Sequence, residues 1–363
     1  MSQLLERLRR ELERVVDPVD RAETLARMAC HLARVGRFSE ARQAIGTLRE
    51  GFGQGQSGRV TVWTMLAEGL VHHYEDFSPA ALDRISRAQL LGVAMGYSTV
   101  IALASVWKAH IEFERSEFDA MLKSLAMTVE HIGDDDHDAQ TRLAIVLSNT
   151  FMICGDRDES HYWFTQGREH AVQNGDQPSV DALLYNRAAF VFAWFRALNC
   201  VEPVAEVEIH RIRLEIQSAA NLQQLMGISA LDNHVRLLAA RILILECRYE
   251  QAIAALKEVR GAAPFAPHNF HQSFIDLEIA FCKVMHGDIE GAAIVFPIVD
   301  LSAFDGLDID EQIYALWMAG RMAGVDSRFG NAMTLEAKLK RIWADYTAQR
   351  ISLRTRLAAF ARS

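Results

Sequence analysis

The sequence predicts an all-α fold, an α-solenoid of about seven helical hairpins with a capping helix at each end. Three observations support this prediction. A short polar break recurs about every 40 residues, and the segments on both sides of each break have helical character. Half of the 363 residues are hydrophobic, and only seven are proline. This composition provides a continuous apolar core and few chain breakers.

The breaks share one pattern. A glycine or a polar residue ends one helix, and an aromatic or aliphatic residue opens the next, often with alanine three residues later. Glycine relieves the backbone at the helix end, Asp or Ser caps the following helix, and alanine allows the two helices to approach closely. The clearest breaks cover residues 36–41, 75–80, 116–120, 155–160, 247–252 and 287–292.

The spacing of the breaks defines the repeat. Equivalent positions in successive breaks are Phe38, Phe77, Phe118, Arg157, Tyr249 and Ile289. The interval from Arg157 to Tyr249 is about twice as long as the others and has room for two units, which a weaker break at 199–203 divides. One hairpin cannot bury its own apolar side, so stacked neighbours must shield one another. We therefore expect a repeat array over 18–327.

The segment 1–17 predicts an N-terminal capping helix. Apolar residues recur on one helical face up to Val15, and Pro18 ends the pattern. The apolar positions are Leu4, Leu5, Leu8, Leu12 and Val15. We expect this helix to cover the first hairpin.

The segment 328–363 predicts a basic amphipathic C-terminal helix. It has eight basic and two acidic side chains, a charge of +6, so the segment 1–327 carries −15 and the whole chain −9. Its apolar seam alternates spacings of four and three, as in a coiled coil. The seam consists of Leu339, Trp343, Tyr346, Arg350, Leu353, Leu357 and Phe360. It either caps the last hairpin or contacts another molecule, for example in a homodimer.

Two breaks resemble the tetratricopeptide repeat (TPR). The segments Gly36-Arg37-Phe38-Ser39-Glu40-Ala41 and 248–252 resemble its Gly-x-(Tyr/Phe)-x-x-Ala turn. The resemblance implies a right-handed superhelix whose concave face binds peptides, protein segments or small ligands. The period is longer than that of the TPR, which is about 34 residues, and the first helices mostly lack its small residues. Both differences favour the long-helix variants found in bacterial signal-responsive regulators.

Polar residues in the first helix of each hairpin are the candidate binding residues. Asparagine is a poor helix former and is costly to bury without a partner. Equivalent positions line up in successive hairpins, so these side chains could bind a peptide backbone or a carboxylate. The alternative is that they are ordinary polar residues on exposed helix faces. The candidates are Arg142, Asn149, Tyr185, Asn186, Arg187, Asn233, Arg236 and Gln272.

No catalytic or cofactor motif is complete. The glycines at 53, 55 and 58 follow a predicted helix, whereas a dinucleotide site needs a preceding strand. The acidic run at 134–138 has Ala139 and Ile145 where a calcium loop needs Gly and Glu. His72 and His73 point to different sides of a helix, and His268 lies in a loop beside Pro267. We therefore expect no metal, no cofactor and no enzymatic activity.

The leading functional hypothesis is a cytoplasmic scaffold or regulatory module that binds a protein or peptide in a concave groove. The alternative is a small-ligand sensor with an enclosed pocket near Trp194. Net charge −9 argues against nucleic acid or an anionic membrane as partner. Five cysteines without a C-x-x-C pair favour a reduced compartment. We find no signal-peptide pattern and no apolar run long enough to span a bilayer.

Overall fold

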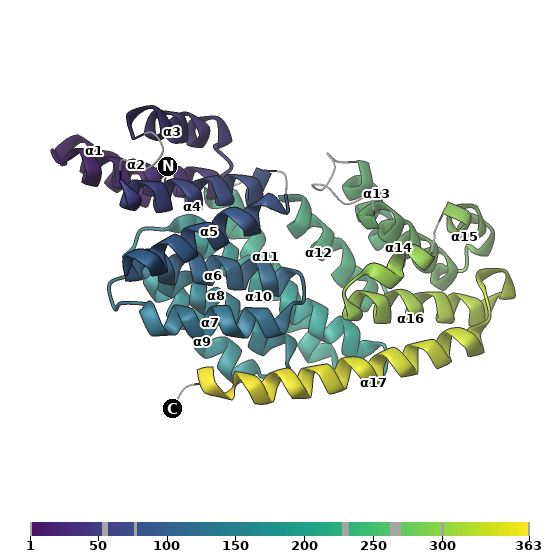
Figure 1. Cartoon of the computed structure of the whole chain (residues 1–363). Coiled ribbons are helices and arrows are strands. Elements are labelled where there is room, and N and C mark those ends of the chain that lie inside the picture. Colours follow the sequence, from purple (N-terminus) through teal and green to yellow (C-terminus); the bar gives the residue numbers. More distant parts are fainter. Residues whose placement is uncertain are drawn as a thin grey trace. The chain divides into compact units, whose positions relative to one another are not determined.

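The computed structural model of the chain describes residues 2–52, 57–75, 78–226, 232–261, 270–298 and 301–361. Within these ranges the chain forms seventeen α-helices and four short 3-10 helices, and no strand (Figure 1). The all-α prediction is confirmed. None of the helices in the described ranges combines the length and the apolar character that crossing a bilayer requires.

The chain divides into two compact units. Unit 1 consists of Met1–Thr150 and Asp158–Leu183, and unit 2 consists of Phe151–Arg157 and Leu184–Ala361. The division falls within three helices, α8 (His137–Ile153), α9 (Arg157–Gln173) at its first residue, and α10 (Gln177–Asn199), so each of them contributes residues to both units.

In unit 1, each helix from α1 to α6 packs on the helix that follows it in the sequence. The second helix also packs on the fourth, and the fourth on the sixth. The helices are α1 (Gln3–Arg14), α2 (Pro18–Arg34), α3 (Phe38–Gly51), α4 (Gly58–Glu75), α5 (Ala80–Met95), α6 (Ser98–Glu114), α7 (Phe118–His131), most of α8, α9 (Arg157–Gln173) and the start of α10.

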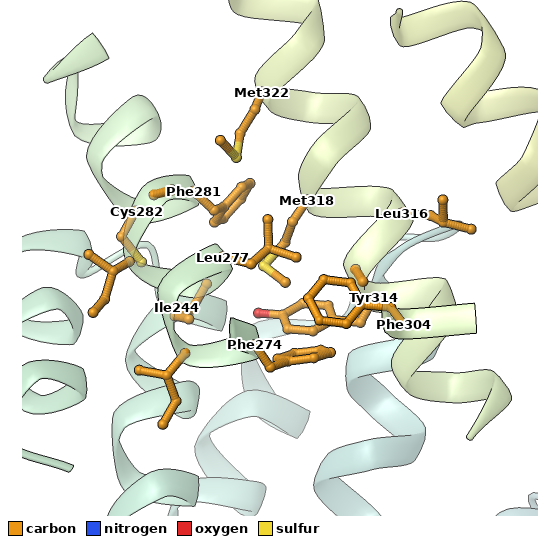
Figure 2. Packing of buried hydrophobic residues seen from close by; sticks show 14 of the residues in the cluster. Ile244, Phe274, Leu277, Phe281, Cys282, Phe304, Tyr314, Leu316, Met318 and Met322 are labelled. Atoms are coloured by element: carbon orange, nitrogen blue, oxygen red, sulfur yellow. The ribbon is translucent and has the colours of Figure 1, made fainter. Parts of the chain in front are cut away.

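Unit 2 contains the rest of α10 and the later helices. They are α11 (Glu206–Met226), α12 (Asp232–Leu245), α13 (Tyr249–Gly261), α14 (Phe270–His286), α15 (Ile289–Val295), α16 (Ile309–Val325) and α17 (Ala332–Leu357). The core between α14 and α16 is aromatic and sulfur-rich, with Phe274, Phe281, Tyr314 and Met318 packed together (Figure 2). Phe274 stacks on Tyr314 with ring centroids 6.1 Å apart.

The predicted breaks coincide with helix ends, and five of them share one turn geometry. Residues Gly36, Ser116, Gly155, Cys247 and Gly287 all have positive φ, between 57° and 94°. In each turn the next residue donates its backbone N–H to a carbonyl five positions earlier, at 2.8–2.9 Å. This hydrogen bond, together with the positive φ of the preceding residue, is the Schellman motif at the C-terminus of a helix. It explains why the break recurs even where Ser or Cys replaces glycine.

Some predicted features fall outside the described residues, namely Phe77, Gly53, Gly55 and His268. Where the chain is described, the rejected motifs have ordinary structural roles. Helix α3 precedes the glycine run, as expected. In the acidic run, Asp136 accepts a hydrogen bond from the Gly133 N–H at 3.0 Å, and α8 begins at the next residue.

The C-terminal helix is engaged within unit 2. Helix α17 packs along α16 (Figure 1), and Leu339 and Tyr346 belong to the unit 2 core. The Arg350 guanidinium lies 4.4 Å from the Trp194 ring centre and 3.7 Å from that of Tyr346. The rest of the predicted seam is buried at Leu353 and Leu357 and half-buried at Trp343 and Phe360. Contact of this helix with another chain stays a prediction.

Candidate binding site in unit 1

The first helices of the predicted hairpins in unit 1 surround a small cavity with both apolar and charged lining residues. Side chains from α2, α4, α6, α8 and the start of α10 line it, and Leu4 and Leu8 of α1 complete its wall. Its volume is about 30 Å³, enough for about two water molecules. We call it the unit 1 cavity.

Two residues that line the unit 1 cavity, Arg34 and Ser179, bind a buried carboxylate. The last residue of α2, Arg34, donates to the Asp176 carboxylate at 2.7 Å. Ser179 on α10 donates to the same carboxylate oxygen at 2.8 Å. Burial alone would raise the pKa of Asp176, but Arg34 outweighs it and holds that pKa below its usual value. Asp176 directly precedes α10, where a negative charge is favourable to the helix. This pair ties α2 to α10.

Arg142 on α8 differs from Arg34, because it is buried without an ion pair to any described residue. Its side chain is only 5% exposed, and its guanidinium lies 3.8 Å from the centre of the Trp107 ring. It forms no ion pair or hydrogen bond with any residue that the structure describes. Burial lowers the pKa of Arg142. A cation–π contact offsets only part of the cost of burying a charge. Arg142 is therefore a buried cation that faces the cavity without a carboxylate partner.

A neutral imidazole adds to the polar lining. His31 is 2% exposed, and both of its ring nitrogens lack a hydrogen-bond partner among the described residues. Burial, helped by the charge of Arg34, lowers the pKa of His31 to about 4. At neutral pH the ring thus offers one donor and one acceptor to whatever occupies the cavity.

An acid on α8 connects the cavity to helix α1. Asp138 accepts a hydrogen bond from Asn174 at 2.7 Å, and Asn174 in turn accepts one from Arg7 of α1. Burial and the nearby Asp176 raise the pKa of Asp138. The acid and the amide therefore serve to position α1.

Helix α1 closes one side of the unit 1 cavity. Leu4, Leu5 and Leu8 are all at most 2% exposed. The Leu4 N–H donates to the Gly175 carbonyl, and the Gln3 N–H donates to the Gln177 side chain, both at 3.0 Å. The helix also packs on α2. It thus reaches from the first hairpin to the start of α10, farther than the predicted cap of one hairpin.

The structure divides the predicted binding residues between the two units. Arg142 and Asn149, both 5% exposed, lie on α8 in unit 1. The other six belong to unit 2: Tyr185, Asn186, Arg187, Asn233, Arg236 and Gln272.

The six residues in unit 2 have varied surroundings. Arg187 is paired with Glu215 at 3.2 Å. The Tyr185 ring meets His234 edge-on at 6.1 Å, and burial raises the pKa of Tyr185 to about 12. Arg236 and Gln272 are exposed, whereas Asn186 and Asn233 are half-buried.

Sequence reasoning missed most of the residues that surround Arg142. They are His31, Arg34, Asp138, Asp176 and Ser179. A usable signal was present, because Arg34 and Arg142 sit in apolar first helices where a buried charge is costly. The two aspartates, Asp138 and Asp176, stand at the start of first helices, where they resemble ordinary helix caps. Their contacts with Asn174 and Arg34 therefore could not be predicted from the sequence.

Comparison with known proteins does not identify the chain. No model of a known protein family matches the sequence, and no curated protein is significantly similar to it.

Proposed function

We propose that this chain is a non-catalytic, TPR-like solenoid of about seven hairpins that recognises a protein or peptide segment on the inner face of unit 1. The recurring turn geometry and the packing of α2, α4 and α6 support the solenoid. The observation that carries the function is the buried Arg142, which faces a cavity without a carboxylate partner among the described residues.

The chemistry of the cavity specifies the segment. Arginine binds carboxylates through two parallel hydrogen bonds, which are strong when water is excluded. The adjoining wall is apolar and accepts the leucines of α1. The proposed partner segment is therefore an amphipathic helix or an extended peptide that offers apolar side chains and one carboxylate. It would bind where α1 now lies.

Two observations support binding over other activities. The Cys30 thiol lines the cavity beside His31, but burial raises its pKa to about 12, so it is no reactive thiolate at neutral pH. A small-ligand sensor with a pocket near Trp194 stays the alternative; the unit 1 cavity itself, at about 30 Å³, is far below the several hundred Å³ of typical organic-ligand pockets.

The test uses three forms of the chain as baits to capture partners from native cytosol, and it compares the captured proteins by mass spectrometry. The baits are the full chain, Arg142→Met, and Arg168→Met as a control on the exposed side of α9. We expect a partner that the wild type and Arg168→Met retain and Arg142→Met loses. Equal capture by all three baits would place the binding surface elsewhere.

A second measurement tests the displacement of α1. When the captured partner binds, the backbone amides of Gln3–Arg14 should exchange hydrogen faster, because the partner replaces this helix. Unchanged protection of these amides would show that the segment does not bind at the position of α1. Circular dichroism of each variant checks that the fold is intact.

A further inference from the structure

Three side chains of unit 1 that can ligate a metal come from two different helices and lie close together. They are His73 on α4, and His110 and Glu114 on α6. The His110 Nε2 atom lies 3.2 Å from one Glu114 oxygen, and the His73 Nε2 atom lies 3.8 Å from the other. One ligand atom from each residue lies within 4.8 Å of the other two. Among the described residues this is the one group of three or more His, Cys, Asp or Glu side chains so arranged.

The fold explains this convergence. Residues 110 and 114 are one helical turn apart, so their side chains lie on the same face of α6. Helix α4 packs against α6, and His73 projects from it, whereas the neighbouring His72 points elsewhere on the helix. The sequence paired His73 with His72 and therefore concealed its spatial partners.

The two imidazoles are held in place by aromatic packing. His73 and His110 are 5% and 8% exposed. The Trp107 ring meets both edge-on, at 6.0 Å and 5.5 Å. Glu114 is different, with 44% of its side chain exposed, so an ion and a water molecule could reach the group from solvent.

The electrostatic state suits a cation. Burial lowers the pKa of His73 to about 4, so its ring is neutral at neutral pH. Burial would raise the pKa of Glu114, but the two histidines outweigh this and hold it at about 2. Arg142 lies near both groups and opposes a bound cation, and the Glu114 carboxylate offsets that charge.

The Glu114 carboxylate alone does not bridge both rings. Its distance to His73 Nε2, 3.8 Å, is too long for a hydrogen bond. A cation between the three ligand atoms would contact all of them, because tetrahedral zinc ligands at about 2.1 Å from the ion lie about 3.4 Å apart. The His110–Glu114 separation of 3.2 Å already fits, and the three ligand atoms, which lie within 4.8 Å of one another, would have to move closer together around the ion.

We propose that His73, His110 and Glu114 bind one divalent cation of the zinc class, with the fourth coordination position open to water or a ligand. Two imidazole nitrogens and one carboxylate oxygen form a ligand set that suits such ions. The proposal replaces the sequence-based expectation of no metal, and its three ligand residues are not among those proposed to bind the peptide.

The experiment is a titration of the metal-depleted full chain with Zn²⁺, followed by calorimetry and by the visible absorption of Co²⁺ as a substitute ion. The variants are His110→Gln and Glu114→Gln, and His72→Gln is the matched control. We expect one Zn²⁺ per chain for the wild type and the control, and a loss of affinity of at least about tenfold in both variants. Zn²⁺ should also raise the thermal midpoint of the wild type, but hardly that of Glu114→Gln.

Two outcomes would overturn the proposal. One is a wild type that takes up less than one equivalent of Zn²⁺ at micromolar concentration. The other is Glu114→Gln binding Zn²⁺ as tightly as His72→Gln. Glu114→Gln keeps the side-chain shape at a partly exposed position, so it should fold and leave the test decisive even if His110→Gln does not.

Discussion

Two buried arginines, one in each unit, differ in how their charge is compensated. Arg142 of unit 1 is 5% exposed and Arg241 of unit 2 is 7% exposed. Both lie over aromatic rings, Arg142 at 3.8 Å from Trp107 and Arg241 at 5.2 Å from Phe274. Arg241 also donates to Glu278 at 2.7 Å, whereas Arg142 has no such partner among the described residues.

Unit 2 repeats this compensation at a second site. Arg196, 3% exposed, pairs with Asp310 at 3.2 Å and lies 4.7 Å from the Tyr314 ring centre. A buried charge that is paired inside the fold serves the fold. A buried charge that faces a cavity without a partner is available to a ligand. The difference between Arg142 and these two arginines supports the proposal that recognition resides at Arg142 in unit 1.

The largest expected effect follows from removing the carboxylate in unit 2. Glu278→Leu would leave Arg241 in the state that Arg142 already has, buried without a counter-ion. We expect the free energy of unfolding to fall by about 3–5 kcal/mol. Urea unfolding followed by circular dichroism measures the change.

The double variant Arg241→Met/Glu278→Leu is the control. It removes both charges, so most of the lost stability should return. If Glu278→Leu alone costs less than about 1 kcal/mol, pairing does not distinguish the two arginines, and the comparison loses its basis.

The second prediction concerns opposite responses of the two units to pH. In unit 1 the pKa of His31 is about 4 instead of 6.5. Below pH 6.5 the unfolded chain takes up this proton and the folded chain does not, so acidification destabilises. In unit 2 burial raises the pKa of Glu311 from 4.5 to about 7. There the folded chain binds the proton first, so acidification from pH 7 to 4.5 stabilises.

Two variants separate these contributions. Between pH 7 and pH 5, His31→Gln should remove an acid-induced loss of roughly 2 kcal/mol. Glu311→Gln should remove the compensating gain and make the chain more acid-sensitive. The neighbouring charges that act on these groups are Arg34, Asp176 and Arg37 for His31, and Arg196, Asp310, Arg241 and Asp308 for Glu311. Equal pH profiles for both variants and the wild type would show that neither group is linked to stability.

The turns were the most predictable part of the fold. Each break depends on a few adjacent residues, such as Gly36 or Gly287 in the left-handed conformation. Such local geometry is determined by residues that are neighbours in the sequence, so it can be predicted from the sequence. The same holds for the boundaries of α3, α7, α9 and α13, which begin at the predicted residues Phe38, Phe118, Arg157 and Tyr249.

The site was far less predictable, because its residues meet through tertiary packing. Arg34 and Asp176 are 142 residues apart, and a spacing rule for single helices cannot relate them. The same limit applies to His73 and His110, which come from different helices. Arg142 was identified because it is a polar residue in a first helix, at a position equivalent to those in other hairpins, and this needs only the spacing of the repeat.

The smallest effect on stability is expected for Arg142→Met, and it tests the comparison most directly. The substitution removes a buried charge that forms no ion pair with a described residue, and it keeps an unbranched side chain against Trp107. The lost cation–π contact and the relieved desolvation cost oppose each other, so the free energy of unfolding should change by less than about 1 kcal/mol. Urea unfolding beside Arg241→Met, which strands Glu278, gives the contrast. A loss above about 2 kcal/mol for Arg142→Met would mean that the folded chain itself compensates this charge, and then no ligand need be invoked for it.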